Sequence, residues 1–218
     1  MNLKAFAVSG KKNSGKTTTV ENIIKELRNQ NYTVGSVKDI HDNVEFDKEG
    51  SDTDRHKKAG AQLVTARGVV ETDLMFQRRL ELDEILNFYS YDYVVLEGFK
   101  SFSLPKILCA KSLEEIDELM DKDVFAVSGL IAEKIEEYKG CPVINSIDDV
   151  EKLVQLIKDK VGDWSKDMSD YQLTLSIGGK DIAMLPFVQN ILLHGITGML
   201  SQLKGYTQKG DIMIKIRR

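Results

Sequence analysis

The first forty residues alternate between an apolar run, a glycine-rich turn and a segment with helical spacing. The run Ala5-Phe6-Ala7-Val8 predicts a buried strand. Apolar residues then recur every three or four positions across residues 17–28, which predicts a helix. After a polar stop, residues 34–38 predict a second strand. This strand-loop-helix-strand order favours a parallel sheet, because such a connection returns the chain in the same direction.

The same alternation continues to about residue 161. Further strands are predicted at 62–66, 93–97, 106–110, 124–127 and 142–145, with helices at 53–60, 82–88, 113–120 and 150–161. Residues 39–54 are acidic, poor in large apolar side chains and without periodicity, which is typical of a long loop leaving the C-terminal end of a strand. The pattern therefore predicts an α/β fold with a doubly wound, mainly parallel sheet.

A second, smaller unit is predicted at the end of the chain. Residues 162–170 are polar and helix-breaking, so we place a boundary near Tyr171. The signals beyond it are, in order, alternating apolar residues at 173–177, a Gly178-Gly179 turn, a return strand at 182–185, an apolar helix from Pro186 to about Gly205 and a closing strand at 212–216. We expect domains at 1–162 and 171–218, the second a β-β-α-β appendage that packs on the first or on a partner subunit.

Composition narrows the range of partners. The 218 residues include 34 acidic and 30 basic side chains, and the formal net charge of −4 offers no electrostatic footprint for nucleic acid or an anionic membrane. Cys109 and Cys141 lack metal-binding spacing, so we expect both to be buried and reduced. We find neither a signal-peptide profile nor an apolar run near the roughly 18 residues that span a bilayer. A cytoplasmic protein is expected, with no nucleic-acid and no membrane partner.

One octapeptide carries the strongest chemical signal. Gly10-Lys11-Lys12-Asn13-Ser14-Gly15-Lys16-Thr17 fits the phosphate-loop pattern G-x-x-x-x-G-K-[ST], and it lies between a predicted strand and a predicted helix. In such a loop the backbone N–H groups surround a phosphate, Lys16 reaches the β and γ oxygens, and the Thr17 hydroxyl binds Mg²⁺. The alternative, a glycine-rich turn with a solvated lysine, does not explain the strand and helix on either side. Lys11 and Lys12 add charge that can point at phosphate or across a subunit interface.

Acidic residues follow two of the predicted strands. Glu97 ends an apolar strand, where nucleotide-binding domains place an acid that holds Mg²⁺ or its water shell, and Gly98 beside it permits close approach of a ligand. An exposed strand-end carboxylate is the alternative. Asp39, His41 and Asp42 follow the second strand and can meet the γ-phosphate, a magnesium-bound water or a second substrate. A solvated acidic loop would give the same pattern.

Three separated motifs together resemble the molybdopterin-guanine dinucleotide biosynthesis protein B (MobB) family. They are the loop Lys12-Asn13-Ser14-Gly15-Lys16-Thr17-Thr18; the stretch containing Lys38, His41, Asp47-Lys48-Glu49-Gly50-Ser51-Asp52-Thr53 and Lys58-Ala59-Gly60; and Val95-Leu96-Glu97-Gly98-Phe99-Lys100. Their order and spacing match over about residues 3–160. The resemblance implies a P-loop NTPase-type fold and a homodimeric, GTP-binding protein with weak Mg²⁺-dependent hydrolysis. Such a protein assists the attachment of a guanine nucleotide to molybdopterin, beside the guanylyltransferase that performs the transfer.

The resemblance also implies residue roles. Residues Gly10 to Thr18 would bind the phosphates, Thr17 and Glu97 would serve Mg²⁺, and Lys38, His41, Asp47 and Asp52 would face the nucleotide or the pterin. Lys16 and Asp39 are our catalytic candidates on the ground of their own positions, in the phosphate loop and directly after the second strand. Two positions depart from the family pattern: Asp39 stands where a second histidine is common, and Glu49 replaces a proline, which loosens its loop. The C-terminal unit lies outside the resemblance.

Two other functions are compatible with the phosphate loop. One is a nucleotide-gated adaptor for the guanylyltransferase without significant turnover. The other is a small-molecule kinase or ligase of a cofactor pathway, for which Arg78-Arg79 is the one pair able to serve as a phosphate lid. The guanine-specific N-K-x-D signature does not occur, so the expectation of GTP rather than ATP rests on the resemblance.

Overall fold

The computed structural model describes residues 3–164, 173–177, 180–184, 186–200, 203 and 212. Contacts divide the chain into two units, Met1–Lys166 and Asp167–Arg218. The first unit contains β1 (Lys4–Gly10), α1 (Lys16–Asn29), β2 (Val34–Lys38), α2 (Asp52–Lys58), β3 (Leu63–Arg67), β4 (Thr72–Phe76), α3 (Leu82–Leu86), β5 (Tyr93–Glu97), β6 (Lys106–Cys109), α4 (Leu113–Leu119), β7 (Val124–Ser128), the 3-10 helix η1 (Leu130–Glu133), β8 (Glu137–Tyr138), β9 (Cys141–Pro142) and α5 (Val150–Lys160).

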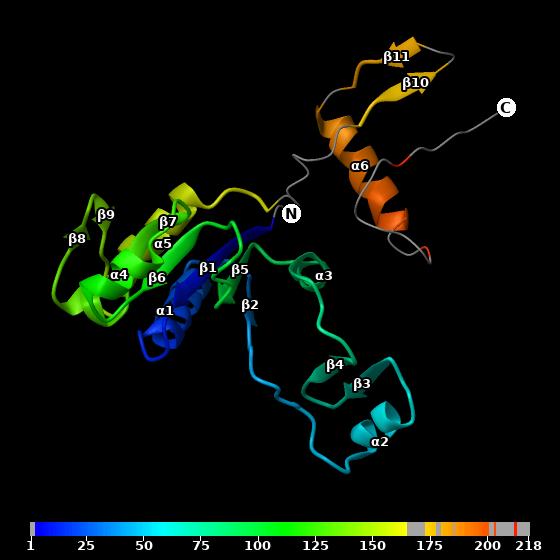
Figure 1. Ribbon diagram of the computed structural model, residues 1–218, viewed down its shortest axis with the longest axis horizontal. Helices are drawn as coiled ribbons and strands as arrows, with labels where there is room; N and C mark the ends of the chain where they lie inside the picture. Colours follow the sequence, from blue (N-terminus) through cyan, green and yellow to red (C-terminus); the bar gives the residue numbers. More distant parts are fainter. Residues whose placement is uncertain are drawn as a thin grey trace. The chain divides into compact units, whose positions relative to one another are not determined.

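The central sheet has five parallel strands in the order β2-β5-β1-β6-β7 (Figure 1). β1 lies at its centre, with Phe6 opposite Val95 of β5 and Val8 opposite Ile107 of β6. Every residue of β5 is buried, as expected for a parallel strand covered on both faces. The predicted α/β fold with a mainly parallel sheet is confirmed, and its architecture is like that of P-loop NTPases.

Helices cover both faces of this sheet because successive residues of β1 point to opposite sides. Phe6 and Val8 pack with α1 and α5 in one core cluster, to which α1 contributes Ile23 and Leu27. Ala5 and Ala7 face the other side and pack with α3, while α4 and η1 complete that side at β6 and β7. Full burial of one such leucine or isoleucine stabilises the fold by about 1.5–3 kcal/mol.

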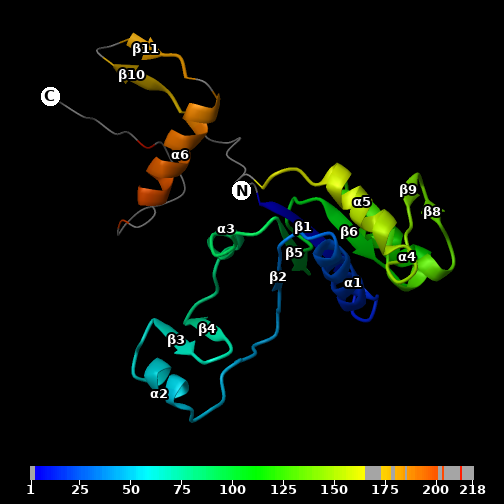
Figure 2. The ribbon, with the colours of Figure 1, turned by 180° about the vertical axis from the view of Figure 1, so that it is seen from behind.

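One predicted strand of the sheet belongs to a separate hairpin instead. β3 pairs antiparallel with β4, with Leu63 opposite Phe76, and the two strands form their own sheet (Figure 2). The prediction that residues 62–66 continue the parallel sheet is therefore wrong, and β4 was missed. Only Val64 of β3 is buried, so this strand lacks the continuous apolar character of a central parallel strand.

Two further predictions differ in detail. Residues 142–145 were expected to form a sheet strand, but β9 pairs antiparallel with β8, and only Val143 bridges to Val127 of the main sheet. Pro142 has no N–H to donate to a central ladder. The predicted helix at 82–88 ends at Leu86, and Phe88 is exposed rather than facing the core.

The second unit has a hairpin followed by a helix. β10 (Leu175–Ile177) pairs antiparallel with β11 (Lys180–Ile182), and α6 (Pro186–Leu200) follows. The return strand thus begins before the predicted residue 182 and ends there. The predicted closing strand at 212–216 lies outside the described residues except for Ile212. Among the described helices, none combines the length and apolar character needed to cross a membrane.

Candidate nucleotide-binding site

The phosphate-loop residues leave the C-terminal end of β1 and enter α1. β1 lies between β5 and β6, so the loop emerges where chain connections diverge to the two sides of the sheet. The backbone φ angle is +147° at Gly10, +60° at Asn13 and +92° at Gly15. Gly15 is the N-cap of α1, and no side chain caps the first turn of that helix. The helix therefore presents N–H groups and its positive dipole end to the loop, which favours binding of an anion.

Close packing at two glycines holds the loop in this shape. A Cβ atom at Gly10 would overlap the carbonyl oxygen of Cys109, and one at Gly129 would overlap that of Ser14. The Ser14 side chain is fully buried, and its Oγ has no hydrogen-bond partner within the described part of the chain. A buried hydroxyl without a partner costs about 1–3 kcal/mol. An oxygen-rich ligand in the loop would offer it an acceptor.

Lys16 is the loop's cation. Its Nζ donates a hydrogen bond to the carbonyl oxygen of Lys11 at 2.6 Å, and its side chain is partly buried. Burial lowers the pKa of the Lys16 ammonium from its ordinary value, and the neighbouring Glu97 carboxylate opposes that effect. An anion bound in the loop would favour the charged ammonium further.

Thr17 and Glu97 bring two oxygen ligands together. The Thr17 hydroxyl donates to Glu97 Oε1 at 3.0 Å, and the same oxygen lies 3.3 Å from Lys38 Nζ. Glu97 is nearly buried at the end of β5. A hydroxyl and a carboxylate suit Mg²⁺, which usually takes one or two protein oxygens and completes its shell with phosphate and water. Within the described residues, no three His, Cys, Asp or Glu side chains form a metal-binding group.

Asp39 lies beside Glu97 at the same sheet edge. Its N–H donates to the Glu97 carbonyl oxygen at 2.9 Å, and a Cβ at Gly98 would lie 3.2 Å from the Asp39 Cβ. The Asp39 carboxylate, about 10% exposed, contacts Arg79 Nη2 at 2.5 Å and His41 Nε2 at 3.6 Å. The structure therefore brings Asp39 and His41 to the edge that holds Glu97.

Arg79 was considered in the sequence only together with Arg78 as a phosphate lid. The structure separates the two side chains. Arg78 makes a two-pronged ion pair with Glu84, at 2.8 and 2.6 Å, whereas Arg79 reaches Asp39. No local sequence pattern indicates this contact, because Asp39 and Arg79 are 40 positions apart.

Asp47 and Asp52 lie at the start of α2, where we find no contact with the phosphate loop among the described residues. Asp47 accepts hydrogen bonds from the hydroxyls of Ser51 and Thr53, each at 3.0 Å, and lies 3.0 Å from Lys57 Nζ. Asp52 is exposed and pairs with Arg55 at 3.5 Å. These partners of Asp47 and Asp52 thus lie at the start of α2 or within it.

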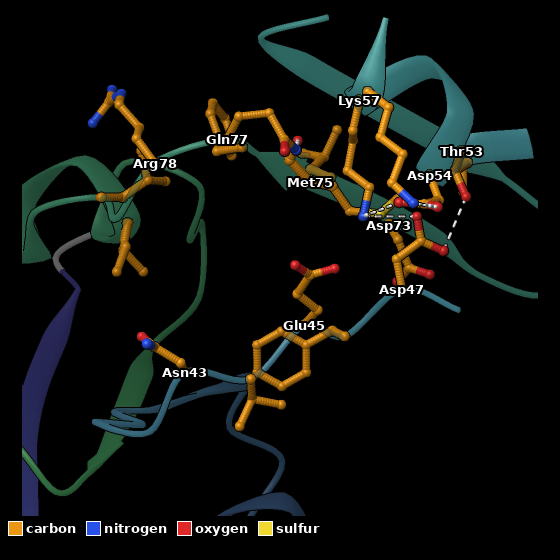
Figure 3. A pocket seen from close by; sticks show the side chains of 18 residues that line it. Asn43, Glu45, Asp47, Thr53, Asp54, Lys57, Asp73, Met75, Gln77 and Arg78 are labelled. Carbon is orange, nitrogen blue, oxygen red and sulfur yellow. Dashed lines mark hydrogen bonds and ion pairs between the residues drawn. The ribbon is translucent and has the colours of Figure 1, made fainter. Parts of the chain in front are cut away.

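A cavity of about 1220 Å³ lies against this helix (Figure 3). It is lined by residues 43–47, parts of α2 and β4, and the segment that leads to α3. Sequence reasoning missed its most buried acid, Asp54, which accepts hydrogen bonds from the Gly50 N–H and Lys58 Nζ, both at 2.8 Å. The Lys58 hydrogen bond holds the pKa of Asp54 below its usual value. Ser51 three residues before Asp54 and Lys58 four after it were the available signals.

The remaining loop residues differ in their surroundings. Lys11 forms an ion pair with Glu118, and that hydrogen bond raises the pKa of Lys11. Lys12 and Thr18 are exposed, and the Lys12 carbonyl oxygen accepts a hydrogen bond from Lys111 Nζ at 3.5 Å. Lys11 is therefore directed to its own chain, while the Lys12 side chain faces solvent.

Comparison with known proteins gives consistent matches. The family model described as molybdopterin guanine dinucleotide synthesis protein B (MobB) matches residues 5–130. A putative molybdopterin-guanine dinucleotide biosynthesis adapter protein of Methanocaldococcus jannaschii is 27% identical, with 98% of this chain and 97% of that protein covered. A probable adapter protein of the same description from Bacillus subtilis is 31% identical over 66% of this chain and 86% of its own length. The crystal structure of Bacillus subtilis MobB superposes with a TM-score of 0.61 at 27% identity, covering 73% of this chain and 98% of that one. At 98% coverage, the archaeal relative also matches the C-terminal unit.

Proposed function

We propose that this chain, which belongs to the molybdopterin guanine dinucleotide synthesis protein B family, is a Mg²⁺-dependent GTP-binding protein that assists the attachment of a guanine nucleotide to molybdopterin. The observation that carries the proposal is the convergence of the phosphate loop with the end of β5, where the Thr17 hydroxyl lies 3.0 Å from Glu97 Oε1. Lys16 adjoins this pair. A Mg²⁺-nucleotide site requires a cationic side chain that binds phosphate, together with a hydroxyl and a carboxylate close to it.

The loop residues suit the phosphates of such a nucleotide. The backbone of Gly10 to Thr18 and the first turn of α1 would donate N–H groups, and the Ser14 hydroxyl would gain the partner that it lacks among described residues. Lys16 would exchange the Lys11 carbonyl for phosphate oxygens. Thr17 and Glu97 would hold Mg²⁺, which when bound neutralises charge on the phosphates.

Hydrolysis at this site should be slow. We place Asp39 and His41 near the terminal phosphate because Asp39 adjoins Glu97 through the β2–β5 ladder. The Asp39 carboxylate contacts Arg79 at 2.5 Å, so Asp39 could act on a water molecule only after Arg79 moves to another partner. A weak GTPase is the activity that this arrangement supports.

The names of the relatives support a proposal for the nucleotide base and the partners. Several of the relatives are named molybdopterin-guanine dinucleotide biosynthesis adapter proteins. For this chain we accordingly propose molybdopterin, the molybdenum cofactor guanylyltransferase and a second copy of the chain as partners. Lys38, Asp47 and Asp52 are proposed to serve the nucleotide or pterin side, although Asp47 and Asp52 lie at α2.

A nucleotide-gated adaptor without significant turnover is the second candidate function. The relatives' names favour it, since each describes an adapter protein. A small-molecule kinase is less well supported, because Arg78 is held by Glu84 in a two-pronged ion pair and is not available to a phosphate lid.

Binding and turnover separate these functions. Wild-type protein should bind GTP in the presence of Mg²⁺ and lose affinity when EDTA removes the metal, and Lys16→Ala should lose triphosphate affinity while its unfolding transition is retained. Single-turnover assays with molybdopterin and the guanylyltransferase then measure hydrolysis. Negligible hydrolysis together with GTP binding would leave the adaptor, and absence of GTP binding would refute both functions.

A further inference from the structure

We propose that Arg79 is a contact for the terminal phosphate of a bound nucleoside triphosphate, and that it moves to this phosphate from Asp39. The inference rests on the nucleotide site proposed above. It assigns to this chain a residue that distinguishes a triphosphate from a diphosphate and that comes from the segment between β4 and α3, outside the phosphate loop.

The contact between Arg79 and Asp39 brings the guanidinium to the sheet edge that carries Glu97. Asp39 follows β2 directly, and its N–H is bonded to the carbonyl oxygen of Glu97, the residue that meets Thr17. Arg79 is thus held by the residue that follows β2, beside the end of β5 that carries the Mg²⁺ candidate Glu97. Among the described residues, the only side chain that holds the Arg79 guanidinium is Asp39, through Nη2.

The backbone that carries Arg79 is anchored to the sheet. Arg78 is paired with Glu84, and Glu84 also accepts the N–H of Glu81 in a capping box at the start of α3. Leu82 and Leu86 of α3 are buried against the sheet. Arg79 therefore extends from a fixed base, and its own side chain, 64% exposed, can change partner with little desolvation.

Charge balance supplies the reason for the exchange. Each of the two strand-end carboxylates holds one cation, Lys38 at Glu97 and Arg79 at Asp39. A terminal phosphate beside the Mg²⁺ ion drawn to Glu97 would add anionic oxygens within this group. A guanidinium uses five N–H donors in a planar fork that matches phosphate oxygens, and a single nitrogen of Arg79 is engaged by Asp39. A nucleoside diphosphate lacks the γ-phosphate, and so it lacks the oxygens that would draw Arg79 away from Asp39.

The exchange would also connect the nucleotide to the cavity described above. Arg78, the residue before Arg79, lines that cavity (Figure 3). Movement of Arg79 toward phosphate would release Asp39 and the loop that follows it. A change from diphosphate to triphosphate would in this way alter the position of residues 43–47, which line the cavity.

A double-mutant cycle tests the exchange. The affinities of the β,γ-imido analogue of GTP and of GDP are measured, with Mg²⁺, for the wild type, Arg79→Gln, Asp39→Asn and the double variant. Arg78→Gln, one position away and paired with Glu84, is the matched control. We expect Arg79→Gln to weaken the triphosphate analogue about 10–100-fold, as for loss of a charged hydrogen bond, with GDP nearly unchanged.

The effect of Arg79→Gln in the Asp39→Asn variant shows whether Arg79 contacts the phosphate itself or only holds Asp39 in place. If Arg79 contacts phosphate, Arg79→Gln remains costly there, because the arginine no longer has a competing carboxylate. If Arg79 only holds Asp39, the substitution has no effect in that background, and the proposal is overturned. Equal weakening of GDP and the triphosphate analogue, or an effect of Arg78→Gln as large as that of Arg79→Gln, would also overturn it. Failure of the wild type to bind the triphosphate analogue would instead refute the proposed function.

Discussion

Substitution of Gly129 by alanine tests the packing that shapes the phosphate loop. Gly129 follows β7 with φ +83° and ψ −156°, a conformation that is essentially confined to glycine. An added Cβ would overlap the Ser14 carbonyl oxygen and lie 3.1 Å from the Ala110 nitrogen. Both neighbours are backbone atoms, so the loop or the end of β6 has to move.

The expected loss of stability is the sum of two effects. The unfavourable backbone conformation costs about 1–3 kcal/mol, and overpacking against fixed backbone costs a further 1–3 kcal/mol or so. We therefore expect Gly129→Ala to lower the free energy of unfolding by about 2–6 kcal/mol and the Tm by roughly 4–24 °C. Displacement of Ser14 should also lower the affinity for triphosphate.

Gly140→Ala is the matched control. Gly140 has a φ angle of +79° but no atom within 4 Å of an added Cβ, so only the conformational cost of about 1–2 kcal/mol applies. The fluorescence of Trp164, the sole tryptophan and a neighbour of the α3 side of the core, reports unfolding of the first unit in urea. Equal destabilisation by the two substitutions would show that the Ser14 carbonyl does not pack on Gly129.

Three other substitutions or treatments have definite expected outcomes. Ser14→Ala should leave the urea midpoint unchanged or slightly higher, because the buried hydroxyl has no described partner, and should weaken triphosphate binding about tenfold. The Cys109 thiol should resist a disulfide reagent at pH 8 until the protein unfolds, because burial raises its pKa to about 12. The folded pKa of Asp54 is lowered, so its stabilising effect is complete above the unfolded pKa of about 3.9 and is lost as pH falls through the lower folded value. Asp54→Asn should reduce this acid dependence of amide-exchange protection in α2, and unchanged dependence would contradict the assigned contacts.

Local sequence patterns were sufficient to predict those parts of the fold that depend on a single strand, loop or helix. The phosphate loop, β1 and α1 follow from the apolar run, the glycines and the helical spacing of Val20, Ile23 and Leu27, all of which are buried. The parallel order of the sheet follows from the alternation of strands and helices. Glu97 was correctly placed at the end of a strand because that strand is continuously apolar.

Features that depend on distant partners were not predictable. β3 has the length of a sheet strand, but its pairing with β4 depends on a turn at residues 68–71 that the alternation did not reveal. The separation of Arg78 from Arg79 depends on which carboxylate each side chain reaches, Glu84 nearby or Asp39 across the site. No periodicity in the sequence encodes either choice.

The central claim, that the loop binds a guanine nucleotide, is tested most directly by equilibrium titration of the wild-type chain with GTP and with ATP in the presence of Mg²⁺. The variant Lys16→Ala serves as the reference for a disabled site. Among the described residues, the Lys16 side chain donates a hydrogen bond only to the carbonyl oxygen of Lys11, so its removal should leave the fold intact. We expect saturable binding of GTP, weaker binding of ATP and loss of both in Lys16→Ala. A clear preference for ATP, or equal binding by Lys16→Ala, would contradict the account.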